Sequence, residues 1–396
     1  MKHTPMTNRP IRLCRIVTVP LTFKALFWDQ LRYLTRRGFD VTLVSSPGAE
    51  LSEVARDLGV AYHAIEMARD AAPWQDLRSL AKFTQWLWSR QFDMIHSSTP
   101  KAGLIAALAG RICSMPVRVH TYTGQVWAEM TGLSRKIVKA MDVIIGRLNN
   151  YCFTDSPSQR QFLIDEGVVA ADKLEVIGAG SVAGVDLVRF NPERLTKVRA
   201  LVRQELQIAP SAVVISYLGR LRADKGINEL VCAFQQLQLQ SLPVELLLIG
   251  PEEFERQPVL PETREMLKTN AHIHVTGYTP EPEKYLSAAD LFCFPSYREG
   301  FGTSVIEAAA MGLPTVASRI QGCVDSVVDG VTGRLVPTKD AVALAKALHE
   351  LVTNADLRRQ MGQASQERAA REFDAELINR LVADKYQWVL GLYNRR

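Results

Sequence analysis

The 396-residue chain lacks any stretch of about eighteen uncharged apolar residues, the length that a membrane-spanning helix requires. We therefore expect no transmembrane segment. Its first ten residues, MKHTPMTNRP, are polar and lack the apolar core of a secretory signal. The sequence thus predicts a cytoplasmic protein.

Cysteine is sparse, and its six residues stand far apart with no pair at the spacing of a metal or redox site. We interpret them as reduced thiols, mostly in the core. The sequence also has no cluster of His and Asp that argues for a metal, so we expect no metal site. A glycine-rich loop ending in Gly-Lys-Ser or Gly-Lys-Thr is missing as well, which disfavours ordinary nucleoside-triphosphate hydrolysis.

Concentrated positive charge is also missing. The net charge is only +5: residues 1–190 hold 23 Lys and Arg against 17 Asp and Glu, and the remainder holds 24 against 25. Nucleic-acid proteins gather cations and aromatic residues on one face, so we expect no nucleic-acid partner. The slight bias fits a weak attraction to anionic surfaces.

The length and the 47% hydrophobic content are sufficient for two domains. Short apolar runs such as IRLCRIVTV, DVTLVSS and VELLLIG alternate with longer helical patterns. This alternation predicts α/β domains with doubly wound parallel sheets. A polar stretch at 191–210 interrupts the series, so we place an N-terminal domain at 1–190 and a C-terminal domain at 191–374. An apolar helical pattern at 375–396 is expected to pack back across the cleft between them.

Ligands of such sheets bind beyond the carboxyl ends of the strands. The segment YLGRLRADKG runs from a strand into a loop, with Gly219 at the turn and two cations, Arg220 and Lys225, five positions apart. Cations at a helix entrance suit a diphosphate. An ordinary solvated loop explains the same residues equally well.

The segment SYREGFGTSVIEAAAMG follows another strand and opens a helix near Gly302 or Thr303. Its small residues allow backbone N–H groups to approach a phosphate. Glu307 lies one turn inside this helix, where a carboxylate can accept hydrogen bonds from ribose hydroxyls, and Glu299 precedes the turn. Taken singly, each glutamate is also consistent with a solvated charge.

Together, Gly219, Arg220, Lys225, Glu299 and Glu307 resemble the donor site of family 4 glycosyltransferases, which are retaining enzymes with the two-domain GT-B fold. The resemblance implies a nucleoside-diphosphate sugar, preferentially a UDP-sugar, bound by the C-terminal domain, an acceptor bound by the N-terminal domain, and neither cofactor nor metal. It implies that Arg220 and Lys225 bind the diphosphate, Glu299 the transferred sugar and Glu307 the ribose. Backbone at Phe301, Gly302, Thr303 and Ser304 completes the phosphate site.

The resemblance adds His120 to Glu299, Arg220 and Lys225 as a catalytic candidate, on the expectation that it follows a strand and lies near the sugar. A hydrogen-bonded histidine at a strand end is the alternative. The candidates on the acceptor side are Lys24, His96, Thr99, Lys101 and Thr123. The first loop reads VPLTFK where many family members carry a glycine pair, so that contact is not carried over.

HSSTPKAGLIAALAGR and HTYTGQVWAEMTG resemble bacterial enzymes that build capsule, O-antigen or exopolysaccharide on a polyprenyl-diphosphate carrier. The segment SRKIVKAMDVIIGRLNNY combines an apolar stripe with cations, which suits weak peripheral binding to an anionic membrane. Packing of that stripe on the sheet is the alternative. A sugar-nucleotide epimerase on the same fold and a non-catalytic nucleotide-sugar binder remain alternative functions.

Overall fold

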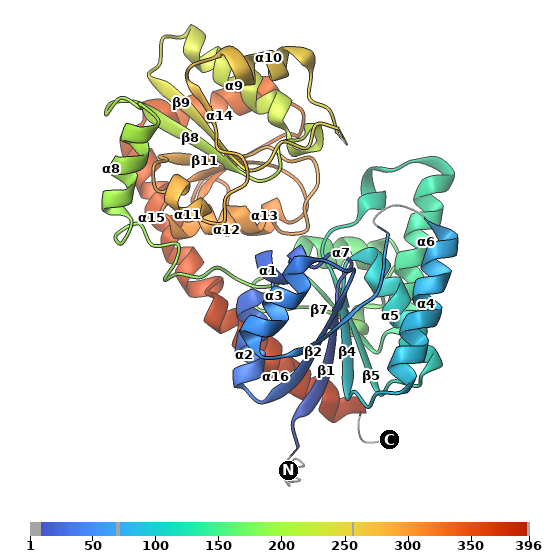
Figure 1. Ribbon diagram of the computed structural model, residues 1–396. Coiled ribbons are helices and arrows are strands. Elements are labelled where there is room, and N and C mark those ends of the chain that lie inside the picture. Colours follow the sequence, from blue (N-terminus) through green and yellow to red (C-terminus); the bar gives the residue numbers. More distant parts are fainter. Residues whose placement is uncertain (1–8, 69–71, 256, 394–396) are drawn as a thin grey trace. The chain divides into compact units, whose positions relative to one another are not determined.

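The computed structural model describes residues 9–68, 72–255 and 257–393, which form two compact units (Figure 1). The first unit holds the described residues up to Gly178 together with those from Ala375 onward, and the second holds Ala179–Asp374. The prediction of no signal sequence rests on residues 1–10, of which residues 1–8 lie outside the described residues.

The first unit contains a seven-stranded, entirely parallel sheet with the order β3-β2-β1-β4-β5-β6-β7. Its strands are β1 (Ile11–Ile16), β2 (Phe39–Ser45), β3 (Ala61–Ala64), β4 (Met94–Ser98), β5 (Val117–Tyr122), β6 (Tyr151–Thr154) and β7 (Leu174–Val176). The crossovers are α1 (Leu21–Ala25), α2 (Trp28–Arg36), α3 (Ala49–Leu58), α4 (Pro73–Trp88), α5 (Pro100–Ile112), α6 (Gly132–Leu148) and α7 (Pro157–Asp165), with short 3₁₀ helices η1 (Val126–Glu129) and η2 (Ala171–Lys173).

The second unit contains a six-stranded, entirely parallel sheet with the order β10-β9-β8-β11-β12-β13. Its strands are β8 (Val213–Leu218), β9 (Val244–Ile249), β10 (Ile273–Val275), β11 (Leu291–Phe294), β12 (Thr315–Ser318) and β13 (Gly333–Val336). Its helices are α8 (Thr196–Glu205), η3 (Ala223–Lys225), α9 (Ile227–Leu239), α10 (Pro261–Thr269), α11 (Pro282–Leu286), α12 (Thr303–Ala310), α13 (Cys323–Ser326), α14 (Ala341–Thr353) and α15 (Ala355–Glu372).

Burial explains why the central strands read as continuous apolar runs. All six residues of β9 are buried, because parallel sheets are covered by helices on both faces. The predicted class, two doubly wound α/β domains, is therefore confirmed. All six cysteines are free thiols, of which four are buried, Cys113 is half-buried and Cys232 is exposed.

The last helix, α16 (Ala375–Tyr393), belongs to the first unit, as its apolar pattern predicts. It packs against α2 and β5, and its buried Tyr386 contacts the ring of Phe39 edge-on with centroids 6.1 Å apart. The Oη of Tyr386 also hydrogen-bonds to Nδ1 of His96 in β4. The final segment of the chain therefore completes the core of the first unit.

The boundary between the units lies earlier than the expected residue 190. Val185 and Phe190 are buried in the core of the second unit, and the N–H of Val185 donates to the carbonyl of Phe373 at 2.7 Å. The polar stretch that interrupts the strand pattern contains α8, a helix of the second unit. Two of its arginines anchor that helix, whereas the composition alone marks this stretch as a domain boundary.

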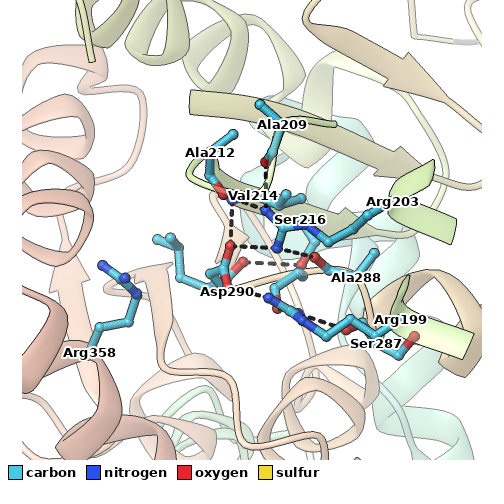
Figure 2. Close-up of polar contacts among 12 residues, drawn as sticks. Arg199, Arg203, Ala209, Ala212, Val214, Ser216, Ser287, Ala288, Asp290 and Arg358 are labelled. Carbon is cyan, nitrogen blue, oxygen red and sulfur yellow. Dashed lines mark hydrogen bonds and ion pairs between the residues drawn. The ribbon is translucent and has the colours of Figure 1, made fainter. Parts of the chain in front are cut away.

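Asp290, directly before β11, is the residue that anchors α8 (Figure 2). Its carboxylate accepts from Arg199 Nη2 at 2.7 Å, from Arg203 Nη1 at 3.3 Å and from the backbone N–H of Val214 at 2.8 Å. Arg199 also donates to the carbonyl of Ser287 at 2.8 Å. One carboxylate thus ties a helix and two central strands together.

Among the helices that the structure describes, none is both long enough and apolar enough to cross a membrane.

Asp290→Ala should destabilise the second unit by roughly 2 to 3 kcal/mol, because it leaves two part-buried guanidinium groups without their carboxylate. A lower midpoint in urea unfolding followed by circular dichroism measures this loss. Asp356→Ala, which removes an exposed partner of Arg359, is the matched control and should leave the midpoint nearly unchanged. Equal midpoints for the two variants would contradict the anchoring role.

Candidate functional site

Each sheet reverses its strand order at one point, and such a point is where open α/β sheets bind ligands. In the first unit the reversal lies between β1 and β4, and in the second between β8 and β11. Because all strands are parallel, the loops that follow each pair emerge at the same edge. The predicted donor residues follow β8 and β11, and most acceptor-side candidates follow β1, β4 or β5.

The loop after β8 is held close to the loop after β11. The backbone N–H of Tyr297 donates to the carbonyl of Asp224 at 3.0 Å. Gly226 permits this approach, since its φ is +73° and a Cβ there would lie 2.1 Å from the carbonyl oxygen of Pro295. Gly219 turns the chain after β8 with φ of +152°, and a Cβ would lie 2.7 Å from Tyr217 Oη.

An ion pair connects the same two loops through side chains. Lys225 Nζ donates to Glu299 Oε1, and Ser296 Oγ donates to the same oxygen at 2.7 Å. Both charged side chains are largely buried, with exposed fractions of 16% and 17%. Two residues 74 positions apart, each predicted from its own motif, are thus brought into contact.

Arg220 lies in the same loop but is half exposed, and Nη1 donates to Glu253 Oε2 at 3.4 Å. Arg222 is more buried and grips Asp224 with two hydrogen bonds of 2.9 Å each. Nη1 of Arg222 also lies 3.6 Å from the Glu253 carboxylate. Arg220 therefore has the freer guanidinium, while Arg222 shapes the loop.

The helix α12 begins directly after Gly302, as the sequence predicts within one residue. Within the described part of the chain, no side chain caps its first turn and no acidic residue lies in that turn. Thr303 and Ser304 are half-buried there, whereas Phe301 is a core residue whose ring packs 5.2 Å from that of Phe373. This helix start suits an anion, because its N–H groups and dipole favour negative charge.

Glu307 lies half-buried in α12. Burial raises its pKa to about 7, and the negative charge of Glu283 adds to this, while the positive charge of Arg189 opposes it. Arg189 itself pairs with Glu283 Oε2 at 2.7 Å. The sequence assigns Arg189 to the first domain, so its electrostatic effect on Glu307 could not be predicted.

In the first unit, the loops after β1 and β4 are joined by two threonines. Thr99 Oγ1 lies 2.8 Å from Thr18 Oγ1 and accepts from the N–H of Thr18 at 3.1 Å. Thr99 adopts φ of +82° and ψ of 140°, a region that threonine rarely occupies. This strained residue at the start of α5 marks the reversal point of the first sheet.

The two histidines lie deeper than the sequence suggests. His96 is buried in β4, and both of its ring nitrogens have partners: Nε2 lies 2.7 Å from Thr121 Oγ1, and Nδ1 bonds to Tyr386 of α16. His96 therefore holds α16 in place, and the expectation that it faces an acceptor is wrong. His120 lies inside β5 and does not follow it, because the strand continues to Tyr122. Its Nδ1 lies 2.9 Å from Ser97 Oγ, and burial and the charge of Arg15 lower its pKa to about 3.

The remaining acceptor-side candidates lie nearer the surface. Lys24 pairs with Glu53 at 2.9 Å, and Lys101 pairs with Asp76 at 2.8 Å. Thr123 is half-buried directly after β5. In the described ranges, no group of three or more His, Cys, Asp or Glu side chains is arranged to hold a metal ion.

Glu307→Gln should make the protein more stable at pH 8 by roughly 1 to 3 kcal/mol. The pKa of Glu307 in the folded state is about 7, above the ordinary value of 4.5, so its ionisation lowers the free energy of unfolding as the pH rises between those values. Above pH 7 the stability that the neutral carboxyl group contributes is fully lost. Urea unfolding at pH 5 and pH 8 measures it. The difference should shrink towards pH 5. A pH-independent difference, or the same behaviour in the exposed control Glu262→Gln, would contradict this account.

Two family models match this chain, one on each unit. Residues 26–180 match the family model of the glycosyl transferase 4-like domain, and residues 198–368 match that of glycosyl transferases group 1. The chain is 29% identical over 372 residues to the capsular polysaccharide biosynthesis glycosyltransferase CapM of Staphylococcus aureus, covering 93% of this chain and 94% of that protein.

A second relative is the UDP-Gal:alpha-D-GlcNAc-diphosphoundecaprenol alpha-1,3-galactosyltransferase of Escherichia coli, 22% identical over 347 residues, which are 86% of this chain and 88% of that protein. The fold is similar to the crystal structure of Anabaena HepE in complex with UDP and glucose, with a TM-score of 0.79 and 19% identity over 95% of this chain and 99% of that chain. With one family model on each unit, the chain belongs to the GT-B glycosyltransferases that combine a family 4-like first domain with a group 1 second domain.

Proposed function

We propose that the protein is a retaining glycosyltransferase that moves a hexose or N-acetylhexosamine from a UDP-sugar to a saccharide carried on a polyprenyl diphosphate. The observation that carries this proposal is the Lys225–Glu299 ion pair beside the uncapped start of α12. The names of the relatives support the details: one is a capsule enzyme, and another uses UDP-Gal and a diphosphoundecaprenol acceptor. The pathway is synthesis of a bacterial surface polysaccharide.

In this proposal the second unit holds the donor. Lys225 and Arg220 bind the diphosphate, with Arg220 exchanging the 3.4 Å contact to Glu253 for phosphate oxygens. Backbone N–H groups from Phe301 to Ser304 complete the phosphate site. Glu307 accepts from the ribose hydroxyls and Glu299 from a hydroxyl of the transferred sugar.

The fixed position of Glu299 favours binding over nucleophilic attack, because Lys225 and Ser296 both donate to one of its oxygens. A double displacement needs a carboxylate beneath the anomeric carbon. We therefore favour same-face substitution, in which the diphosphate leaves as the acceptor hydroxyl approaches and a leaving oxygen takes the proton. Stabilising the diphosphate and positioning the acceptor supply the catalysis, without a metal.

On the acceptor side, Thr99, Lys101, Lys24 and Thr123 are the candidates that remain near the surface. His120, which is buried and has a pKa of about 3, would stay neutral and support the end of β5 without moving a proton. Incubation with donor alone separates the alternatives: an epimerase isomerises the sugar, a transferase hydrolyses it slowly, and a binder does neither. Transfer that requires a lipid-linked saccharide supports the proposal.

We also propose weak peripheral binding to an anionic membrane through α6. The apolar stripe of this helix, for which packing on the sheet is the alternative, is divided between a buried side and an exposed side. Ile145 is buried, whereas a second row is exposed and consists of Leu133, Ile137, Met141 and Ile144. Exposed Lys136 and Arg147 accompany this row, while Arg135 and Lys139 pair with Glu166.

Arg220→Ala and Lys225→Ala should each slow transfer by roughly thirty-fold to a thousand-fold, since each removes about 2 to 4 kcal/mol of stabilisation of the leaving diphosphate. Lys225→Ala should cost more, because it also releases Glu299. Arg220→Lys should remain impaired, since an ammonium lacks the bidentate fork. Steady-state transfer of folded variants measures these effects.

The double alanine variant should lose less than the sum of the singles if both cations act on one diphosphate. Lys197→Ala, an exposed cation of α8 in the same unit, is the matched control and should transfer normally. Normal transfer by folded Arg220→Ala and Lys225→Ala would place the diphosphate elsewhere.

Ile137→Ser combined with Met141→Ser should weaken binding to phosphatidylglycerol vesicles by roughly ten-fold, because both apolar side chains leave the interface. Binding of the unaltered protein should also fall as salt rises, since screening removes the contribution of Lys136 and Arg147. Sedimentation with vesicles measures both. Leu239→Ser, at an 80% exposed leucine of the second unit, should have no effect. Unchanged sedimentation of the double variant would show that α6 does not contribute to membrane binding.

A further inference from the structure

A short loop after β5 is tied to α6 at both of its ends. The loop, Thr123–Val126, is flanked by Tyr122 and Trp127, and both flanking side chains donate to Asp142. Tyr122 Oη donates to the backbone carbonyl of Asp142 at 2.8 Å, and Trp127 Nε1 donates to its carboxylate Oδ2 at 2.7 Å. One residue of α6 therefore fixes where the loop begins and where it ends.

The anchor at Trp127 is firmly packed. Its side chain is fully buried, and its ring stacks on that of Phe162 with centroids 5.2 Å apart and an interplanar angle of 20°. Arg135 and Lys139 lie over the same ring at 5.2 and 5.5 Å, and both cations pair with Glu166. Displacing Trp127 would break a stack, two cation contacts and a hydrogen bond to a carboxylate.

The loop between these anchors is more open than the anchors themselves. Val126 is 45% exposed and Thr123 and Gly124 are half-buried, although Gln125 is buried. The loop emerges from the carboxyl end of β5, the edge where open α/β sheets receive ligands. The half-buried Thr123 hydroxyl therefore lies between two residues that are both anchored on α6.

A buried carboxylate is an energetically costly acceptor for an indole N–H, because its charge loses hydration. Asp142 is only 3% exposed, and burial raises its pKa to about 6, although the Trp127 hydrogen bond acts in the opposite direction. A backbone carbonyl or a side-chain amide would satisfy the indole without placing a charge in the interior. The charged acceptor instead gives a stronger and more directional bond.

We propose that Asp142 is a positioning residue of glycosyl transfer, which fixes the loop Thr123–Val126 so that Thr123 meets the acceptor saccharide. This inference rests on the proposed function. It also gives α6 a second role: its outer row of apolar residues faces the membrane, while its inner face sets the acceptor loop. The helix would thus link the surface that carries the lipid to the loop that receives the sugar.

Asp142→Leu and Trp127→Phe should each raise the KM for the acceptor about ten-fold, since each removes a hydrogen bond to a charged group. The probe is N-acetylglucosaminyl-diphosphoundecaprenol with UDP-galactose as donor. The KM for the donor should stay within about two-fold, because the donor residues lie in the other unit. Asp142→Asn keeps an acceptor oxygen for Trp127 and should restore the acceptor KM to within about three-fold. Hydrogen exchange of the amides of residues 123–126 should rise in the first two variants and not in the third.

Tyr151→Phe is the matched control. It removes a comparable aromatic-to-carboxylate hydrogen bond, to Glu175 at 2.5 Å, from the neighbouring strand, and should leave the acceptor KM unchanged. An unchanged acceptor KM in folded Asp142→Leu and Trp127→Phe, or an equal rise in Tyr151→Phe, would overturn the positioning role while transfer by the unaltered protein stands. If the unaltered protein transfers to no lipid-linked acceptor, the proposed function fails, and the positioning role fails with it.

Discussion

The ion pair between Lys225 and Glu299 is the interaction on which the candidate site depends. It joins the loops after β8 and β11 where the second sheet reverses its strand order, and Ser296 holds the carboxylate in place. The close backbone approach at Gly226 makes the contact possible. A cation and a carboxylate are thereby fixed side by side, and in the proposed function this arrangement preorganises the site for the diphosphate and the sugar.

Similar pairs of a cation with a carboxylate occur in both units. Arg220 contacts Glu253, Lys24 contacts Glu53 and Lys101 contacts Asp76. In the proposed function a diphosphate replaces the Glu253 carboxylate at Arg220, so that one charge-assisted hydrogen bond is exchanged for another. Glu307 differs from these paired groups, because burial raises its pKa to about 7.

The sequence predicts the features that depend on short segments: the alternation of strands and helices, the start of α12 and the loops that carry Lys225 and Glu299. It failed where distant segments meet. His96 looked like a loop-facing histidine because its partner, Tyr386, lies 290 residues away. The boundary near residue 190 was misplaced because Val185 and Phe190 pack in the core of the second unit, where Val185 bonds to Phe373, far away in the sequence. The contact of Trp127 with Asp142 had no sequence signal, since each residue fits an ordinary apolar or helical pattern.

The central claim is that the second unit binds a nucleoside diphosphate through Lys225, Arg220 and the start of α12, without a metal. Calorimetric titration with UDP tests it most directly, performed once in EDTA and once with Mg²⁺. The account predicts binding in both, with dissociation constants that agree within about three-fold, since a helix start and two cations supply the positive field. Binding that appears only with Mg²⁺, or no binding of UDP in either buffer, would contradict it.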